Sequence, residues 1–251
     1  RETCGQSRGM KAAVIREFGD PEVLRVEDVE KCKIADEHQV LIAVEYTSIN
    51  PIDWKTRRGN LRFILGFHFP KILGYDVSGR VAEVGTEVRN FKIGDRVATR
   101  LDNAQGGAYA EFAVAGEKVL TKIPENINFQ SAAAVPLAGL TALQGLRNYG
   151  KLKSSERVLI LGGAGGVGYV AIQIARILGA SVHVVCSERS MEYVRTANPD
   201  KIIDFEKTDV VDLVDRYDVI FDTIGEYPYI RMKHLLLTVG RYITTLPRPK
   251  V

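Results

Sequence analysis

The sequence at residues 157–168 reads Arg157-Val158-Leu159-Ile160-Leu161-Gly162-Gly163-Ala164-Gly165-Gly166-Val167-Gly168. The apolar run at 158–161 is typical of a buried strand, and a glycine turn and a helix start follow it. This geometry suits the pyrophosphate of a dinucleotide, because free N–H groups at a helix N-terminus attract anions. A glycine turn formed for steric reasons alone is the alternative.

Each glycine of this stretch has a predicted role. Gly163 makes the tight turn, Gly165 lets the backbone approach the phosphates, and Gly168 lets the helix lie close to the strand. Gly166 and Val167 complete the predicted phosphate site at the helix start. We expect all five residues, 163 and 165–168, to contact a cofactor.

The residues that follow support the cofactor site over the steric turn. Apolar residues recur at helical spacing from Val170 to Leu178, and Gly179 ends this pattern. A second predicted strand, 182–185, comes next. This completes a strand-helix-strand unit of the size that binds a dinucleotide.

The end of the second strand bears on the choice between NAD and NADP. NAD-binding units usually place an acidic residue there, which binds the adenine ribose hydroxyls. Here Cys186 has that position, Ser187 can donate a hydrogen bond, and Arg189 can pair with a 2′-phosphate. We therefore predict NADP(H). Two alternatives stay open: Glu188 can serve the ribose instead, and Arg189 can be an ordinary solvated charge.

Composition excludes several classes of protein. The chain has 251 residues, 45% hydrophobic and 26% charged, which is typical of globular domains. Its net charge of +3 is too small and too dispersed for a nucleic-acid surface, and no stretch is long and apolar enough to cross a membrane. The densest basic cluster, around Lys55 and Arg57, is interpreted as hydrated surface. Three widely separated cysteines indicate neither a disulfide framework nor a zinc knuckle.

The pattern along the chain predicts two domains. Short strands and glycine turns fill residues 10–125 and indicate a barrel-like all-β domain, with strands at 12–15, 40–44, 77–84, 96–98 and 109–114. Residues 126–251 begin with a predicted helix at 131–149 and then alternate strands with helices. Further strands at 201–203, 219–221 and 241–245 can lie parallel in one doubly wound sheet, so the fold class is α/β.

A second turn is expected at the cofactor. Asp222-Thr223-Ile224-Gly225 leaves the end of the strand 219–221, and ligands of such sheets collect at the carboxyl ends of strands. We expect Ile224 and Gly225 to face the nicotinamide. Asp222 is equally well explained as a cap of the next segment.

Two motifs in combination resemble the medium-chain dehydrogenase/reductase superfamily. They are Asn50-Pro51-Ile52-Asp53-Trp54-Lys55 in the first domain and the glycine turn in the second, supported by Leu73-Gly74-Tyr75-Asp76-Val77-Ser78-Gly79. The chain looks like its zinc-independent quinone oxidoreductase branch, which includes zeta-crystallin-like and enone reductase-like proteins. The resemblance implies a GroES-like β barrel followed by a Rossmann domain.

The resemblance also implies that the site holds no metal. Zinc-dependent members have a Cys in the first motif and a His in the second, where this chain has Asn50 and Tyr75. Neither residue suits Zn²⁺ as a thiolate or imidazole does. The implied reaction is hydride transfer from NADPH to a quinone or to the C=C bond of an α,β-unsaturated carbonyl.

The resemblance assigns roles to individual side chains. Asn50 lies beside the nicotinamide and donates to the acceptor or orders a water, and Lys55 binds the nicotinamide ribose or acts as a donor. Tyr75 lines the acceptor pocket. Thr141 and Phe205 are expected at the cofactor, the latter beside the adenine. Each has an alternative: a turn for Asn50, solvation for Lys55, packing for Tyr75, a backbone hydrogen bond for Thr141 and the core for Phe205.

Relatives extend beyond the strand at 241–245, so the resemblance implies that the usual C-terminal segment, with part of a homodimer contact, is lacking. Two hypotheses besides the reductase therefore stay open: a shortened paralogue or fragment that binds nucleotide without turnover, and an enoyl-thioester reductase. The expected partner is a small quinone or enone. The expected location is the cytoplasm, or an organelle matrix if an upstream transit peptide is removed.

Overall fold

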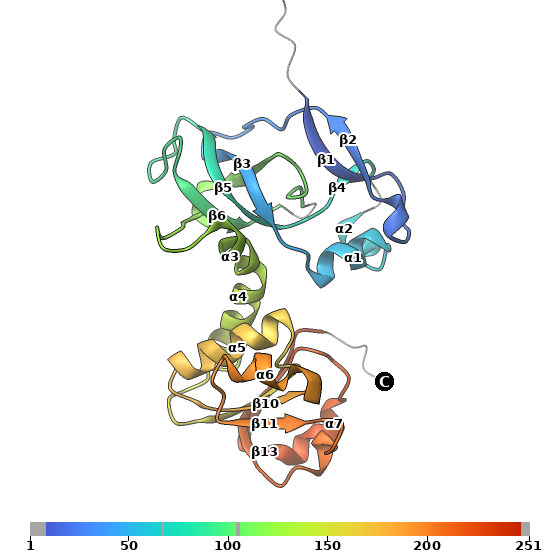
Figure 1. Cartoon of the computed structure of the whole chain (residues 1–251), viewed down its shortest axis with the longest axis vertical. Helices are drawn as coiled ribbons and strands as arrows, with labels where there is room; N and C mark the ends of the chain where they lie inside the picture. The colour runs from blue at the N-terminus through green and yellow to red at the C-terminus, as the bar shows by residue number, and fades with distance from the viewer. Residues whose placement is uncertain (1–8, 67, 104–105, 247–251) are drawn as a thin grey trace, which may run out of the picture. The chain divides into compact units, whose positions relative to one another are not determined.

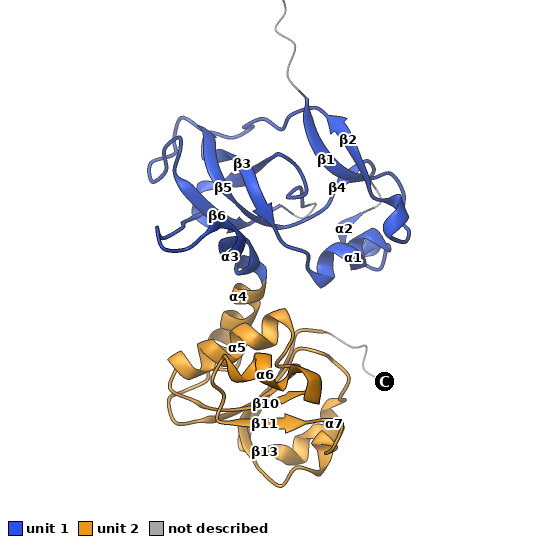
Figure 2. Cartoon of the chain, viewed as in Figure 1, with its two compact units in different colours: residues 1–137 blue, residues 138–251 orange. Residues whose placement is uncertain are grey.

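The computed structural model of the chain describes residues 9–66, 68–103 and 106–246. The chain divides into two compact units, Arg1–Leu137 and Ala138–Val251, which Figure 2 distinguishes by colour. This division falls inside α4 (Pro136–Leu143), farther along the chain than the predicted boundary at 125–126. The reason is α3 (Phe129–Ala134), which packs against strands of the first unit.

The first unit is built from antiparallel strands (Figure 1). Its sheets have the orders β2-β1-β4 and β7-β3-β5-β6-β8, and every neighbouring pair is antiparallel. The strands are β1 (Met10–Ile15), β2 (Arg25–Val29), β3 (Gln39–Thr47), β4 (Lys71–Ile72), β5 (Asp76–Val84), β6 (Arg96–Arg100), β7 (Phe112–Gly116) and β8 (Thr121–Lys122). Short helices connect them: η1 (Pro21–Val23), α1 (Pro51–Arg57), α2 (Arg62–Leu65) and η2 (Glu117–Val119). The predicted all-β character is confirmed.

One basic residue of this unit is not hydrated surface. Arg57 is only 8% exposed, and its guanidinium Nη1 donates to the carbonyl oxygen of Gly19 at 2.6 Å. The N–H of Gly19 in turn donates to the Arg57 carbonyl oxygen at 3.0 Å. The interpretation of the basic cluster as solvated was therefore wrong for Arg57, because a loop distant in sequence covers it.

The second unit contains one parallel sheet of order β11-β10-β9-β12-β13. Its strands are β9 (Arg157–Leu161), β10 (Ser181–Cys186), β11 (Lys201–Asp204), β12 (Tyr217–Asp222) and β13 (Leu236–Thr244). The connecting helices are α5 (Gly166–Ile177), η4 (Glu188–Ser190), α6 (Met191–Arg195), η5 (Val210–Asp212), α7 (Tyr229–Met232) and η6 (Lys233–Leu235). The predicted parallel, doubly wound sheet is confirmed.

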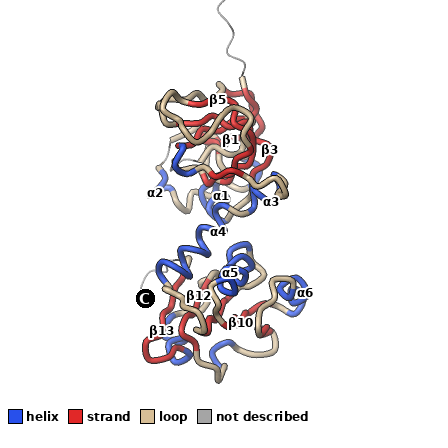
Figure 3. Tube along the Cα trace, turned by 90° about the vertical axis from the view of Figure 1, so that its left-hand side faces the viewer, coloured by secondary structure: helices blue, strands red, loops and turns tan. Residues whose placement is uncertain are grey.

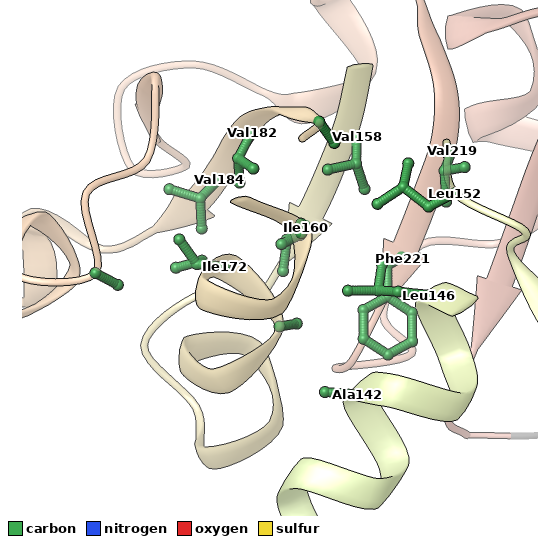
Figure 4. Packing of buried hydrophobic residues seen from close by; sticks show 14 of the residues in the cluster. Ala142, Leu146, Leu152, Val158, Ile160, Ile172, Val182, Val184, Val219 and Phe221 are labelled. Carbon is green, nitrogen blue, oxygen red and sulfur yellow. The ribbon is translucent and has the colours of Figure 1, made fainter. Parts of the chain in front are cut away.

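Both faces of this sheet are buried, which explains the continuous apolar run in β9. Val158 and Ile160 pack in a cluster with α5 and Phe221, which Figure 4 shows from close by. Leu159 and Leu161 belong to the cluster on the opposite face. Figure 3 shows helices in blue around the red strands of this unit. Since side chains alternate along a strand, a strand covered on both faces needs apolar residues at every position.

The predicted helix at 131–149 is a series of shorter segments. After α3, the helix α4 begins at Pro136, and a π-helical segment, η3 (Gln144–Tyr149), continues it. Proline suits the first turn of a helix, where its missing N–H costs no hydrogen bond. No helix in the described ranges combines the length and apolarity that a membrane crossing requires.

Truncating Phe221 should destabilise the second unit. Its side chain is fully buried against α5 and the α4–η3 segment. We expect Phe221→Ala to lower the free energy of unfolding by about 3–5 kcal/mol, because it leaves a cavity. Phe205→Ala is the matched control, since Phe205 is 47% exposed. Denaturant unfolding followed by circular dichroism measures both; equal losses in the two variants would contradict the described packing.

Candidate functional site

The glycine turn lies between β9 and α5 and is tied to the neighbouring strand β10. The N–H groups of Gly162 and Gly163 both donate to the carbonyl oxygen of Val185, at 3.2 and 2.9 Å. Gly162 has the left-handed conformation, with φ of +82°. The sequence analysis assigned the tight turn to Gly163, and this was wrong: the left-handed residue of the turn is Gly162. Spacing alone does not reveal which of two adjacent glycines has the positive φ.

Close packing explains two other glycines of the turn. A Cβ at Gly163 would lie 1.9 Å from Cγ2 of Val184, and a Cβ at Gly168 would lie 2.1 Å from the carbonyl oxygen of Gly162. Neither contact is possible, so both positions exclude a side chain. The predicted role of Gly168, close approach of helix and strand, is confirmed.

The start of α5 is open to solvent. Gly165 and Gly166 are exposed, and a Cβ at Gly166 would meet no atom within 4 Å. The first N–H groups of an α-helix have no partner within the helix, and they attract negative charge. This helix N-terminus therefore has room for a phosphate against its backbone.

A second turn lies beside the glycine turn, at the end of β12. Oδ1 of Asp222 accepts from the N–H groups of Ile224 and Gly225 at 3.0 and 2.7 Å, so Asp222 caps this turn. The hydroxyl of Thr223 donates to the carbonyl oxygen of Leu161 at 2.7 Å. The two turns thus meet at the carboxyl ends of neighbouring strands. Ile224 is 37% exposed there, whereas Gly225 is buried.

The predicted ribose residues lie at the end of β10. Cys186 packs in the hydrophobic core, and Ser187 is 9% exposed with its Oγ 3.1 Å from Oγ of Ser190. Arg189 is exposed and forms no ion pair with any described residue. Phe205, after β11, is 47% exposed, which contradicts the alternative of a core residue. Thr141 is half-buried on α4.

An acidic group that the sequence analysis did not identify lies at the same strand ends. Carboxylate oxygens of Glu188, Asp204 and Glu206 lie within 4.8 Å of one another. The ammonium of Lys207 is 2.6 Å from Oε1 of Glu188 and 3.6 Å from Oδ2 of Asp204. A cation of the chain itself therefore already neutralises part of this group. The parallel register of β10 and β11 brings these residues together, and sequence spacing does not show it.

In the first unit, Asn50 precedes α1 and belongs to a buried polar network. Its side-chain Nδ2 donates to Oγ of Ser48 and to Oδ2 of Asp76, both at 2.9 Å. The Ser48 hydroxyl donates to the same Asp76 oxygen at 2.6 Å. An ionised carboxylate only accepts hydrogen bonds, so it orients the Asn50 amide with nitrogen toward Asp76. The two acceptor oxygens are only 2.6 Å apart, so they lie on one side of the amide nitrogen and share one of its N–H bonds.

Asp76 also holds the start of α4. Its Oδ1 accepts from the N–H of Leu137 at 2.9 Å, and the residue is fully buried. Burial raises the pKa of the Asp76 carboxyl, and the hydrogen bonds from Ser48 and Asn50 oppose this rise. Sequence analysis missed Asp76 as a site residue; the signal was an acidic residue directly before the predicted strand 77–84.

Asp53 supports the same loop from the other side. Its Oδ2 accepts from the N–H of Asn50 at 2.7 Å and from the hydroxyl of Tyr109 at 3.0 Å. Oδ1 is buried without a hydrogen-bond partner. Burial raises the pKa of the Asp53 carboxyl above its ordinary 3.8, against the hydrogen bond from Asn50.

The other two predicted catalytic residues differ in accessibility. Lys55 is half-buried, its ammonium has no carboxylate partner among the described residues, and it lies 5.5 Å from the centre of the Trp54 ring. Tyr75 is 2% exposed, and the Arg100 guanidinium lies 5.2 Å from its ring centre. The structure thus favours the packing alternative for Tyr75 and leaves Lys55 available.

Comparison with known proteins agrees with this architecture. Residues 36–125 match the alcohol dehydrogenase GroES-like domain family. A chloroplast envelope quinone oxidoreductase homolog of Arabidopsis thaliana is 37% identical over 221 residues, 84% of this chain and 67% of the relative. The chain belongs to the quinone oxidoreductase branch of the medium-chain dehydrogenase/reductase superfamily.

Other members of this branch extend the comparison. A chloroplastic NADPH-dependent alkenal/one oxidoreductase of Arabidopsis thaliana is 39% identical over 86% of this chain. The quinone oxidoreductase of Coxiella burnetii has a solved structure with a TM-score of 0.84, 34% identity, and coverage of 93% of this chain and 74% of the other. The chain spans 67% of the envelope homolog and 58% of the alkenal/one oxidoreductase.

A methyl group at position 168 should disrupt the turn. We expect Gly168→Ala to destabilise the second unit by about 1–3 kcal/mol, because its Cβ would overlap the Gly162 carbonyl oxygen. Gly166→Ala, in the same helix turn, should leave stability unchanged or higher, since its Cβ meets open space. Thermal unfolding by circular dichroism tests the pair. Equal melting temperatures in the two variants would disprove the close approach.

The raised pKa of Asp53 predicts a pH-dependent stability of the first unit. The Asp53 carboxyl keeps its proton to a higher pH in the folded chain than in the unfolded chain, where its pKa is 3.8. Its contribution to stability is therefore complete below pH 3.8 and is lost as the pH rises through the folded pKa. Asp53→Asn cannot ionise and so avoids this loss. The melting temperature of the variant minus that of the natural chain should therefore be higher at pH 7 than at pH 4. Trp54, the chain's single tryptophan, reports unfolding of this unit by fluorescence. A difference that is constant with pH would count against the raised pKa.

Proposed function

We propose that this chain carries the site of an NADPH-dependent reductase that transfers hydride to a quinone or to the C=C bond of an α,β-unsaturated carbonyl, without a metal. The observation that carries the proposal is the open N-terminus of α5 behind the glycine turn, joined to the end of β10. The names of the relatives, quinone oxidoreductase and alkenal/one oxidoreductase, support the acceptor class.

The cofactor fits the second unit in this proposal. The N–H groups of residues 166–168, at the start of α5, would hold the pyrophosphate, and Ile224 and Gly225 would lie at the nicotinamide end. The ribose and adenine lie near Ser187, Arg189 and Phe205. When bound, the cofactor supplies the hydride, and the protein supplies position and electrostatics.

NADPH is preferred to NADH because of three features at the end of β10. Cys186 is buried in the core, so no acidic side chain has the usual ribose position. Ser187 is a hydroxyl donor, and Arg189, which forms no ion pair within the described part of the chain, has a guanidinium of the kind that binds a phosphate in bidentate fashion. Glu188, the competing ribose acceptor, is bonded to Lys207.

Asn50 and Lys55 act on the acceptor in this proposal. Because Ser48 and Asp76 lie on one side of the Asn50 nitrogen, its other N–H bond can donate to the acceptor, and its carbonyl oxygen can order the water that supplies a proton. Lys55 is the side chain available to donate a hydrogen bond to the acceptor's oxygen. Tyr75 is a packing residue.

The side chains near Asn50 support metal-free chemistry. Ser48 and Asp76 are engaged in hydrogen bonds with each other and with Asn50, and the carbonyl oxygen of Asn50 is a neutral oxygen, not a thiolate, imidazole or carboxylate of the kind that zinc takes. Tyr75 offers no thiolate or imidazole, and the Arg100 guanidinium against its ring opposes a second cation there. The donor set does not suit zinc.

The location follows from the same relatives. Their chloroplastic names, together with a mitochondrial NAD(P)H oxidoreductase of Danio rerio that is 34% identical, support the organelle alternative over the cytoplasm.

Turnover tests the proposal directly. The chain should oxidise NADPH in the presence of a small quinone or a reactive enone, and calorimetry should show NADPH binding. Treatment with a chelator should leave the rate unchanged. Binding without turnover would favour the alternative of a nucleotide-binding fragment, and absence of binding by the folded chain would overturn the proposal.

Arg189 should determine the preference for NADPH. Arg189→Ala removes the proposed partner of the 2′-phosphate, so NADPH binding should weaken by about 1–3 kcal/mol and NADH binding should hardly change. Arg195→Ala is the matched control on the following helix, and it should affect neither cofactor. Calorimetric titration with both nucleotides measures the effect; equal losses for NADPH and NADH would refute the assignment.

A further inference from the structure

The end of β10 contains a charge arrangement that the proposed function does not yet explain. Glu188 directly precedes Arg189, in the region where an adenine ribose is expected, and its carboxylate is 63% exposed. A free carboxylate there would accept hydrogen bonds from the ribose hydroxyls of NADH and would repel a 2′-phosphate. The chain therefore needs a feature that makes Glu188 compatible with NADPH.

Lys207 meets this requirement through its position after β11. Its Nζ donates to Oε1 of Glu188 at 2.6 Å and lies 3.6 Å from Oδ2 of Asp204. Asp204 is 7% exposed, and that oxygen has no hydrogen-bond partner. A buried carboxylate oxygen without a hydrogen bond attracts a nearby cation. Asp204 therefore favours a Lys207 ammonium close to the strand ends, where it donates to Glu188.

The backbone places the two segments side by side. Cys186 and Asp204 are register partners in the parallel pair of β10 and β11, and the N–H of Phe205 donates to the Cys186 carbonyl oxygen at 3.3 Å. Oδ1 of Asp204 accepts from the N–H of Glu206 at 3.0 Å, which closes the turn that carries Lys207. The two strand ends thus keep Lys207 next to Glu188.

We propose that Lys207 is a positioning residue for cofactor choice: it pairs with Glu188, so that this carboxylate neither binds the ribose of NADH nor repels the 2′-phosphate of NADPH. The inference rests on the proposed function, because it assumes that NADPH binds at the end of β10. It assigns to Lys207 no direct contact with the phosphate. Arg189 remains the residue that meets the phosphate.

A double-mutant cycle tests this role. Lys207→Gln should lower the ratio of NADPH affinity to NADH affinity about two- to five-fold, the size of effect that an exposed ion pair supports. In a Glu188→Gln background the same Lys207→Gln change should leave the ratio of NADPH affinity to NADH affinity unchanged, because the carboxylate that Lys207 is proposed to neutralise is then absent. Lys207→Arg should preserve the ratio of the natural chain.

Lys201→Gln is the matched control. Lys201 lies at the other end of β11 and forms a 2.7 Å ion pair with Asp215, so its loss removes a similar pair far from the strand end. The ratio of NADPH affinity to NADH affinity in the Lys201→Gln variant should match that of the natural chain. Calorimetric titrations with NADPH and NADH measure all variants, and circular dichroism checks that each is folded.

The outcomes separate the two proposals. If Lys207→Gln weakens NADPH equally in both backgrounds, Lys207 contacts the phosphate directly and the inference is wrong. If the ratio does not change in either background, the inference is also wrong while the proposed function stands. If the natural chain binds neither nucleotide, the proposed function fails and the inference fails with it.

Discussion

The close approach of α5 to the end of β9 is the constraint on which the second unit depends. Only glycine fits at 168, because any Cβ there would overlap the Gly162 carbonyl oxygen. This approach places the helix N-terminus beside the end of β10, to which the turn is hydrogen-bonded through Val185. The backbone segment that lets α5 pack closely against the end of β9 therefore also presents free N–H groups, which can bind a phosphate.

In the first unit, the buried carboxylate of Asp76 connects segments that are distant in sequence. Asp76 accepts hydrogen bonds from Ser48 and Asn50 before α1 and from the Leu137 N–H at the start of α4. Burying a charge is costly unless its hydrogen bonds are satisfied, and here the donors come from residues far apart in sequence. The consequence for chemistry is an Asn50 amide with a defined orientation, which limits what it can offer to a substrate.

Much of the architecture could be predicted because it follows local rules. The apolar run of β9, the amphipathic spacing of α5 and the glycines between them indicated the strand-helix-strand unit. The predictions were less accurate where neighbours distant in sequence decide the outcome. Arg57 is covered by the loop of Gly19, Tyr75 packs against Arg100, and the left-handed conformation falls on Gly162. Lys207 was not identified, because its partner Glu188 follows a different strand, in η4.

The amino-acid order by itself determined the fold class, the glycine turn and the family, since periodicity and glycine spacing are properties of short segments. Tertiary structure alone decided how the side chains share hydrogen bonds and charge: which way the Asn50 amide points, whether Tyr75 is accessible, and which cation pairs with Glu188. Such pairings depend on strand register and on burial, and both arise only when distant segments pack together.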